Sequence, residues 1–218
     1  MKIAALADIH GHIATIRNIG EELSRADLVV LAGDLTRFGH AGVAAQVLDA
    51  VRTFNPRVLA VTGNCDHPDC EPYLETAGVA LNCRRVVFEG VEFFGLSASL
   101  PCPFHTLNES TEEEFGARLD AMAQQHDAAL PCVLVSHQPP FRTKADHAWI
   151  GGHVGSRSVR KFIEQSLPLL CFTGHIHEAR SIDQLGPTQI VNPGPWAKGK
   201  YAIATIENGA ARVELRSA

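Results

Sequence analysis

Seven side chains that could bind a metal ion follow short apolar segments of the sequence. Each of five segments ends in a small or turn residue, and a potential ligand comes directly after it. The seven comprise two aspartates, one asparagine and four histidines: Asp8, His10, Asp34, Asn64, His137, His175 and His177. Oxygen and imidazole donors without a thiolate are typical of sites for Mn, Fe, Zn, Co or Ni, and they argue against copper(I) and iron–sulfur clusters.

The spacing of these residues predicts that they meet in one crevice. In open α/β sheets, ligands bind outside the carboxyl ends of the strands. Asp8 and His10, like His175 and His177, are two residues apart, a spacing that places both side chains on the same side of an extended chain. We therefore expect each pair to clamp an ion. The glycines that precede three of the ligands are expected to permit turns that other residues resist.

The number of ligands indicates more than one ion. Seven exceed what one tetrahedral ion needs. Because a carboxylate has two oxygens, one aspartate can bridge two ions, and Asp34 is the natural candidate. We therefore predict two divalent ions with four protein ligands each, one of them shared. A single Asp-x-His or Gly-Asp is more often a turn, but the ordered set of five is hard to explain in that way.

The elements that must position these residues begin with alternating strands and helices. We expect strands over residues 2–7, 28–32 and 57–61, with helices over 13–23 and 43–54 between them. This β-α-β-α-β order predicts a parallel sheet core.

The second half of the chain has a different pattern. A hairpin is expected over 86–96, and a capping box of Ser110 and Glu113 predicts a helix that continues to about residue 126. A further helix is expected over 156–165, and strands are expected over 133–135, 169–172, 188–191, 201–206 and 212–215. We interpret the chain as one domain over residues 1–218, with a parallel core and an antiparallel second half.

Composition limits the class of protein. The chain has 218 residues, of which 45% are hydrophobic and 20% charged, as is ordinary for a globular domain. Its net charge of -5 disfavours a nucleic-acid binder held by phosphate contacts, although a nucleic acid could still be a substrate. We expect neither a membrane helix nor a signal peptide. Six cysteines without a Cys-x-x-Cys pair suggest reduced thiols and a cytoplasmic protein.

Taken in order, the motifs resemble those of the calcineurin-like metallophosphoesterases, and the size resembles the small bacterial and archaeal members. The matching pieces are Asp8-x-His10-Gly11, Gly33-Asp34, Gly63-Asn64 with Asp66, Ser136-His137, Gly174-His175-x-His177 and the VNPG turn at 191–194. The resemblance implies an α/β fold, a four-layer α/β/β/α sandwich of two packed mixed sheets. It also implies that one ion is held by Asp8, His10, Asp34 and His177, and the other by Asp34, Asn64, His137 and His175.

The function implied by this resemblance is hydrolysis of phosphoric esters. Two divalent ions, manganese among the candidates, would leave the centre with a net positive charge that attracts a phosphate anion. A hydroxide bridging the ions would attack a small phosphomonoester or phosphodiester without a covalent enzyme intermediate.

Further residues are candidates for substrate contact or proton transfer. His12 follows the first ligand pair, and Trp149 and His153 lie in the long segment 138–155, expected at the crevice mouth. Asn64 is a candidate for substrate contact as well as for metal binding. Cys65 stands where many family members have a histidine that donates a proton, so the general acid stays open among Cys65, Asp66 and His67. The simpler alternatives are a helix cap for His12, packing for Trp149, the surface for His153 and a turn for residues 64–69.

Two other functions fit the same motifs. A nuclease or cyclic-nucleotide phosphodiesterase would use the same centre, but no basic track or aromatic stacking surface is visible. The second alternative is a non-catalytic scaffold that binds other proteins, which would resemble one subunit of the retromer sorting complex with the same fold. The complete set of seven candidate ligands favours catalysis instead. A Ser-His-Asp hydrolase is disfavoured because no Gly-x-Ser-x-Gly motif occurs. The sequence does not assign an oligomeric state.

Overall fold

Three consecutive β-α units and a C-terminal hairpin build the first of two sheets. The computed structural model describes residues 1–149 and 151–218. The first sheet has the order β13-β12-β1-β2-β3. Strands β1, β2 and β3 are parallel to one another, β12 is antiparallel to β1, and β13 is antiparallel to β12. Its strands are β1 (Lys2–Leu6), β2 (Leu28–Ala32), β3 (Val58–Val61), β12 (Lys200–Glu207) and β13 (Ala210–Ser217). The parallel core predicted for the first half of the chain is thus confirmed.

The second sheet is mostly parallel, and the prediction of an antiparallel second half is wrong. In the order β10-β11-β9-β6-β5-β4, the four central strands are parallel and only the two edge strands are antiparallel. The reason is that α4 (Glu112–Ala123) and α5 (Arg157–Ser166) each cross over between neighbouring parallel strands. The strands are β4 (Arg85–Phe88), β5 (Val91–Leu96), β6 (Cys132–Ser136), β9 (Leu170–Phe172), β10 (Ser181–Leu185) and β11 (Thr188–Asn192).

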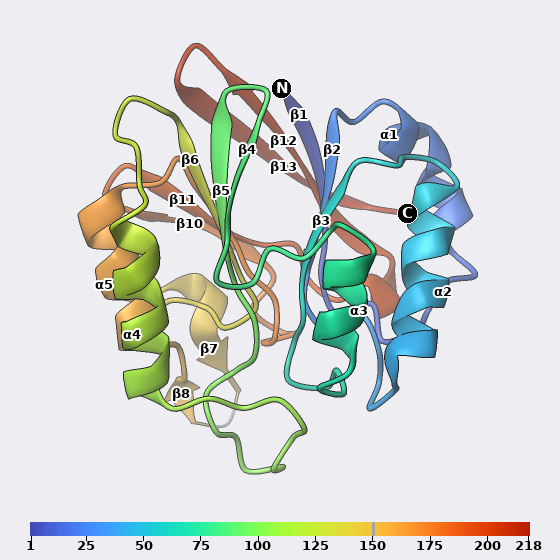
Figure 1. Cartoon of the computed structure of the whole chain (residues 1–218), viewed down its shortest axis with the longest axis horizontal. Helices are drawn as coiled ribbons and strands as arrows, with labels where there is room; N and C mark the ends of the chain where they lie inside the picture. The colour runs from blue at the N-terminus through green and yellow to red at the C-terminus, as the bar shows by residue number, and fades with distance from the viewer. Residues whose placement is uncertain (150) are drawn as a thin grey trace.

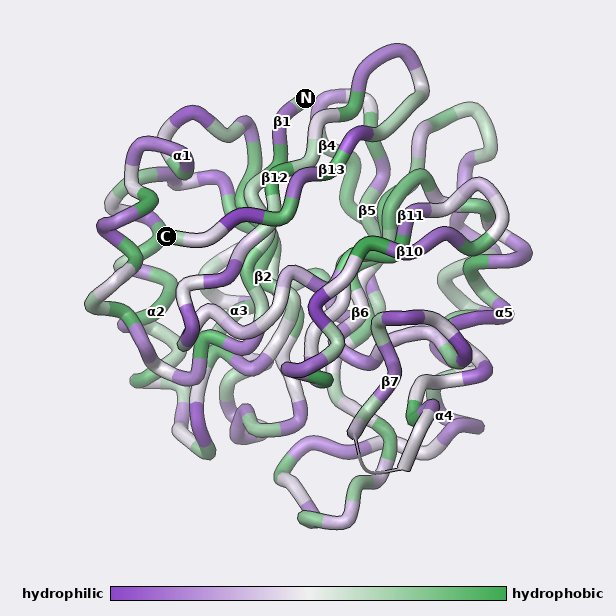
Figure 2. The backbone as a smooth tube through the Cα atoms, turned by 180° about the vertical axis from the view of Figure 1, so that it is seen from behind, coloured by the Kyte–Doolittle hydropathy of each residue, from purple (hydrophilic) through white to green (hydrophobic). Residues whose placement is uncertain are grey.

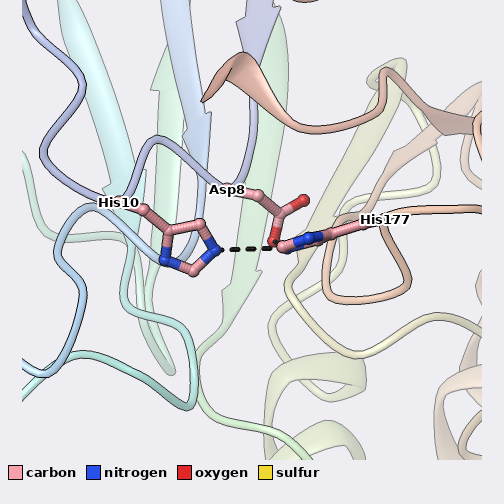
Figure 3. A group of neighbouring side chains, drawn as sticks. All are labelled: Asp8, His10 and His177. Atoms are coloured by element: carbon pink, nitrogen blue, oxygen red, sulfur yellow. Dashed lines mark hydrogen bonds and ion pairs between the residues drawn. The ribbon is translucent and has the colours of Figure 1, made fainter. Parts of the chain in front are cut away.

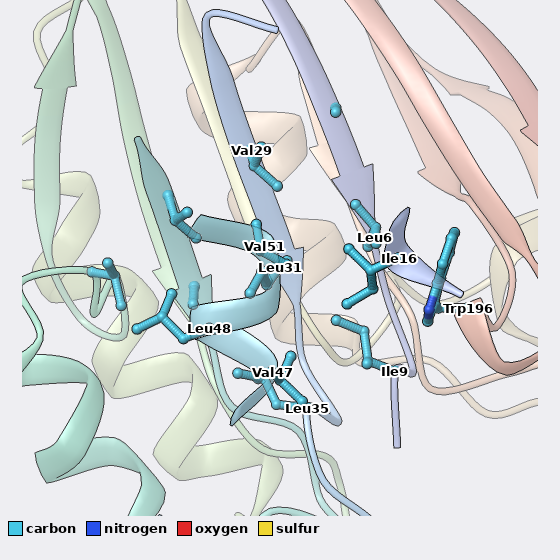
Figure 4. Packing of buried hydrophobic residues seen from close by; sticks show 14 of the residues in the cluster. Leu6, Ile9, Ile16, Val29, Leu31, Leu35, Val47, Leu48, Val51 and Trp196 are labelled. Carbon is cyan, nitrogen blue, oxygen red and sulfur yellow. The ribbon is translucent and has the colours of Figure 1, made fainter. Parts of the chain in front are cut away.

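Successive side chains along each strand point to opposite faces of the sheet, and the buried residues form three hydrophobic clusters. Ile3 and Ala5 of β1 face the second sheet, where they join Phe93 and Val133. Ala4 and Leu6 face the other way and pack with the helices that cover the first sheet (Figure 4). A third cluster joins α4 and α5 to the second sheet. The result is the predicted four-layer α/β/β/α sandwich (Figure 1), in which each fully buried Val, Leu or Ile side chain contributes about 1.5–3 kcal/mol.

The helices of the first half differ from the expectation. The apolar spacing over 13–23 does not form one helix but a 3-10 turn, η1 (Ile16–Ile19), followed by the short α1 (Gly20–Ser24). α2 (Ala41–Arg52) is close to the prediction, and α3 (Cys70–Thr76) was not predicted. All of these lie on the outer face of the first sheet (Figure 1).

Two features of the second half also differ from the expectation. The capping box of α4 is formed by Thr111 and Glu114, not by Ser110 and Glu113, because the Ser110 amide donates to Ser99 instead. A small hairpin of β7 (His147–Ala148) and β8 (Gly152–His153) lies within the long segment after β6.

Hydrophobic residues concentrate in the central strands, and the peripheral loops carry many of the hydrophilic ones (Figure 2). None of the helices in the described part of the chain has both the length and the apolar character required to cross a membrane.

Candidate metal centre

Five strands from both sheets end at one edge of the sandwich. Asp8, Asp34 and Asn64 follow β1, β2 and β3 of the first sheet, whereas His137 and His175 follow β6 and β9 of the second. These strands run in the same direction and end at the lower edge in Figure 1. The structure therefore brings the seven predicted ligands together, and we call them the central cluster.

The backbone of the central cluster is bent, not extended. Asp8, His10, Asp34 and His175 have φ angles of 53°, 49°, 51° and 68°, in the left-handed region that non-glycine residues rarely adopt. The argument from an extended chain for the clamp pairs is therefore wrong in its geometry, although both pairs converge. Backbone bonds hold the bends: the Asp8 amide donates to Gly33 at 3.1 Å and the His10 amide donates to Asp34 at 2.9 Å. Strain of this kind gathers at functional sites.

One half of the central cluster is formed by residues after β1, β2 and β9. Nε2 of His10 lies 3.2 Å from Nε2 of His177, and the two rings point toward each other beside Asp8 (Figure 3). Nε2 of His177 is 3.4 Å from Oδ1 of Asp8, and Nε2 of His10 is 3.7 Å from Oδ2 of Asp34. Two ligands of a tetrahedral ion, each about 2.0–2.1 Å from it, lie about 3.3 Å apart. These four side chains therefore have the separations that a shared ion requires.

The other half lies deeper between the sheets. Oδ1 of Asn64 is 3.0 Å from Nε2 of His137 and 2.8 Å from Nδ1 of His175. Nε2 of His137 is 3.6 Å from Oδ1 of Asp34. The two carboxylate oxygens of Asp34 thus face different histidines, His10 on one side and His137 on the other. This arrangement supports the bridging position predicted for Asp34.

Main-chain carbonyls orient two of the imidazole rings. Nδ1 of His10 donates to the carbonyl of Thr36 at 3.1 Å, and Nδ1 of His137 donates to the carbonyl of Ala32 at 2.9 Å. Because a carbonyl only accepts, the proton sits on Nδ1 and the Nε2 lone pair points into the central cluster. Burial lowers the pKa of both histidines, which keeps these lone pairs free.

Several residues outside the central cluster hold its loops in place. The buried carboxylate of Asp66 accepts hydrogen bonds from the amides of Leu35, Thr36 and Gly63 at 3.1, 2.7 and 2.8 Å. It joins the loop that carries Asp34 to the loop that carries Asn64, which is an anchoring role in place of the proton relay considered from the sequence.

Two asparagines that sequence reasoning missed support other loops. The side-chain amide of Asn108 donates to the carbonyl of Gly63 at 3.0 Å, and that of Asn192 donates to the carbonyl of Ile176 at 2.9 Å. Asn192 belongs to the VNPG turn, which could have pointed to it. Asn108 lies in a polar loop with no comparable signal.

The charge and bonding of the central cluster fit bound cations. Oδ2 of Asp8 is buried and accepts no hydrogen bond from the described residues. Burial, together with the nearby carboxylates of Asp66 and Asp8, raises the pKa of Asp34 well above its usual range. Buried carboxylates of this kind are stable when paired with cations, so the donor set and its charge suit divalent ions.

Two glycines are required by close approach to the central cluster. A Cβ atom on Gly63 would overlap the carboxylate and backbone nitrogen of Asp34, and one on Gly33 would overlap the His137 ring. Gly33 also has a φ of 91°, as the expected turn requires, whereas the reason for glycine at position 63 is space and not a turn.

The thiol of Cys65 lies at the border of the central cluster. Its sulfur is within 4.8 Å of potential ligand atoms of His10 and Asp34, and its amide donates to Oδ1 of Asp34 at 2.8 Å. Burial and the carboxylates of Asp34, Asp66 and Asp8 raise the pKa of this thiol in the metal-free protein. Cys65 is therefore close enough to affect both metal and substrate.

Of the predicted substrate contacts, Asn64 belongs to the central cluster, whereas His12, Trp149 and His153 lie outside it. The side chain of His12 is exposed, and Trp149 is 85% exposed on the β7–β8 hairpin. The Trp149 amide donates to Glu178, the neighbour of His177, at 3.1 Å. Nδ1 of His153 lies 2.7 Å from Oδ1 of the buried Asp146. The hairpin is thus tied to the loop that carries His177.

Comparisons with known proteins agree with this geometry. The family model of the calcineurin-like phosphoesterase superfamily domain matches residues 1–209. An uncharacterized protein from Methanocaldococcus jannaschii is 36% identical over 212 residues, which cover 95% of this chain and 94% of that protein.

Solved structures show the same fold at low sequence identity. A Thermus thermophilus protein superimposes with a TM-score of 0.79 at 15% identity, covering 99% of this chain and 98% of that one. A dimetal phosphatase from Danio rerio superimposes with a TM-score of 0.70 at 14% identity, covering 100% of this chain and 96% of that one.

Proposed function

The chain belongs to the calcineurin-like phosphoesterase superfamily, and on this premise we propose that it hydrolyses a small phosphomonoester or phosphodiester at the central cluster. The observation that carries the proposal is the position of Asp34. Its two carboxylate oxygens lie 3.7 Å from Nε2 of His10 and 3.6 Å from Nε2 of His137, so that one carboxylate serves both halves of the central cluster.

Two sets of ligands follow from these contacts. One divalent ion would be held by Asp8, His10, Asp34 and His177, and the other by Asp34, Asn64, His137 and His175. When bound, two such ions lower the pKa of a coordinated water and neutralise charge on the phosphoryl oxygens. The donors suit Mn, Fe, Zn, Co or Ni.

The chain's own residues define the side from which a substrate enters. The side chain of His137 is fully buried, whereas that of His177 is 42% exposed and that of His10 is 11% exposed. Substrate therefore approaches over His10 and His177. The hydrogen bonds that fix the His10 and His137 rings keep the ligand atoms oriented before substrate arrives, which reduces the reorganisation needed during the reaction.

Candidate substrate contacts lie around this entrance. His12 is two residues after His10 in the sequence, and the hairpin with Trp149 and His153 is tied to the His177 loop through Glu178. We assign to the exposed Trp149 ring an apolar contact with the part of the substrate beyond the phosphoryl group. His153, whose ring nitrogen lies close to Asp146, supplies a polar contact beside it.

The test combines metal counting with two model substrates. The metal-free chain is reconstituted with Mn²⁺ and assayed on bis-p-nitrophenyl phosphate and on p-nitrophenyl phosphate. Asp34→Asn should lose both equivalents of metal and the activity, whereas His137→Ala should lose mainly one equivalent. His105→Ala, which changes an exposed histidine on another loop, serves as the control.

Two outcomes would contradict the proposal. A wild-type chain that never exceeds one ion across different metals would exclude the dinuclear arrangement. A chain that holds two ions and hydrolyses neither ester would favour the protein-binding scaffold instead. The relative rates on the two esters separate a diesterase from a monoesterase.

A further inference from the structure

A second group of potential metal ligands lies outside the central cluster. Nδ1 of His40 is 2.8 Å from Oδ2 of Asp69, and Nδ1 of His67 is 3.0 Å from Oδ1 of the same carboxylate. The two imidazole rings lie side by side with their centroids 3.8 Å apart. One ligand atom from each residue falls within 4.8 Å of the other two. We call His40, His67 and Asp69 the outer cluster.

The outer cluster is assembled from two loops that lie far apart in the sequence. His40 precedes the first residue of α2, His67 lies in the loop after β3, and Asp69 precedes the first residue of α3. Both helices begin at the edge where the strands of the first sheet end (Figure 1). The amide of His67 donates to the carbonyl of Gly39 at 3.2 Å, so that the two loops are joined beside the cluster.

Helix capping explains only part of this arrangement. Oδ1 of Asp69 accepts a hydrogen bond from the amide of Ala41 at 3.0 Å, at the start of α2. That contact needs neither imidazole, yet two histidines from different loops direct a ring nitrogen to the same carboxylate. Hydrogen bonds from both histidines lower the pKa of Asp69, which leaves the carboxylate ionised and able to act as a ligand.

The donor set and its spacing suit a transition metal. Two imidazole nitrogens and one carboxylate oxygen are a common set for zinc, in which water completes the coordination. Ligands of a tetrahedral ion lie about 3.3 Å apart, and the nitrogen–oxygen distances of 2.8 and 3.0 Å require only a few tenths of an ångström of opening. The side chains of His40 and Asp69 are 68% and 45% exposed, so an ion and its waters can reach them.

We propose that the outer cluster binds one divalent transition-metal ion, such as Zn²⁺, Co²⁺ or Ni²⁺, in addition to any ion at the central cluster. This ion connects the loop after β2, which carries Asp34, to the loop after β3, which carries Asn64. It therefore stiffens the two loops that carry ligands of the central cluster without contacting the substrate.

The test uses the full-length chain and Co²⁺ as the probe. Bound Co²⁺ is counted by elemental analysis and followed by its visible absorption, neither of which depends on hydrolysis. His40→Ala and His67→Ala should each bind one equivalent fewer than wild type, whereas the exposed His105→Ala should bind the full number. Asp69→Asn keeps an oxygen for the Ala41 amide, so it tests the lost charge with the helix cap in place. Because Asp69 is itself a ligand, the variant should weaken this site by at least the roughly 10–100-fold loss typical of an outer-shell partner.

Metal binding at the outer cluster can be tested independently of the proposed hydrolysis at the central cluster. Asp34→Asn should lose the ions of the central cluster and keep the outer one, and adding His40→Ala to it should remove that ion too. The proposal is overturned if His40→Ala/His67→Ala, with wild-type circular dichroism, binds as many ions as wild type. It is equally overturned if Asp34→Asn binds no ion. In both cases hydrolysis by the wild-type chain would still stand as support for the phosphoesterase.

Discussion

His175 and His177 are two residues apart, but their surroundings shift their pKa values in opposite directions. Burial lowers the pKa of His175 to about 3. A hydrogen bond to Asp8 raises the pKa of His177 above its ordinary value near 6.5. The two histidines belong to different halves of the central cluster, so we expect protons to compete with bound metal ions for the two halves at different pH.

This difference predicts stepwise release of metal on acidification. An imidazole must be neutral to bind an ion. As the pH falls through the raised pKa of His177, a proton occupies that ring. The affinity of the half of the central cluster that contains His177 for its metal ion then drops by about tenfold per pH unit. His137 and His175 have lowered pKa values, so their half keeps its ion to lower pH.

Metal content after dialysis at a series of pH values from 8 downward measures the order of release. We expect one equivalent to leave before the other, and His177→Ala to abolish the first step. Loss of both equivalents over the same interval, in wild type, would show that His177 does not set the order.

Cys65 predicts a preference for substrates with good leaving groups. A departing alkoxide needs a proton, whereas a nitrophenolate does not, and general acid catalysis contributes about 10²–10⁴-fold. A thiol is a poorer acid here than an imidazolium. Cys65→His should therefore raise the turnover of glycerol phosphate relative to p-nitrophenyl phosphate.

The measurement is the aryl-to-alkyl rate ratio at full metal occupancy, with Cys65→Ser as the matched control. A ratio that stays the same in Cys65→His would mean that another group already supplies the proton. Cys65 would then act only by filling space beside His10 and Asp34.

At the scale of elements, the ends of β2 and β3 approach each other so closely that position 63 must be glycine. In Gly63→Ala the new methyl group overlaps the Asp34 carboxylate, so we expect loss of metal and a cost of about 1–3 kcal/mol in the free energy of unfolding. Gly42→Ala is the control, because among the described residues no atom beyond its chain neighbours and its own helix backbone lies within 4 Å of its Cβ position in α2.

Chemical denaturation and metal counting on both variants check this prediction. Gly42→Ala should bind metal normally and gain about 0.5–1 kcal/mol of stability, as alanine does within a helix. Equal metal content in the two variants would show that the loop relaxes around the added methyl group.

The β7–β8 hairpin predicts an effect on substrate choice alone. Because Trp149 is 85% exposed, Trp149→Ala should leave stability and metal content unchanged. It should raise KM for substrates with a large apolar group and have little effect on small ones. Kinetics on a panel of phosphoesters measure this, with the equally exposed Phe104→Ala as the control. Unchanged kinetics across the panel would leave Trp149 as a surface residue.

At the scale of the whole molecule, the central cluster joins the two sheets. Asp8, Asp34 and Asn64 come from the first sheet, whereas His137, His175 and His177 come from the second. An ion bound only by the folded chain stabilises it by about 2.7 kcal/mol when its free concentration is 100 times its Kd. For a chain of this size that corresponds to an increase in Tm of about 5–10 °C per ion.

Metal removal should therefore lower the Tm, and reloading should restore it. Thermal unfolding of EDTA-treated and Mn²⁺-reloaded protein measures the shift, and Asp34→Asn should show much less of it. A Tm that is the same with and without metal would mean that the ions do not hold the sheets together.

Local patterns determined much of the fold. The strands of the first sheet and the helix α5 lie close to their predicted ranges, because short apolar runs and capping residues act over a few positions. Sequence patterns that fit more than one local structure gave wrong predictions. Ser110 and Thr111 are both followed by a glutamate three residues later, so either could form the capping box. Thr111 forms it in the structure, where the Ser110 amide instead donates to the carbonyl of Ser99. Likewise, the isoleucines of 13–23 pack against the sheet from a turn.

The convergence of the seven side chains of the central cluster could be predicted from the sequence, because they follow apolar segments and parallel strands end at one edge. Their role as metal ligands stays a prediction. Only the tertiary structure decided how they meet. Asp34 turns one oxygen to each half of the cluster. Asp8 and His10 adopt left-handed backbone because their amides donate hydrogen bonds to carbonyls of the loop after β2, which hold them there. His40 and Asp69 lie 29 positions apart, yet they share a hydrogen bond. Such contacts depend on packing between distant segments, which no local pattern encodes.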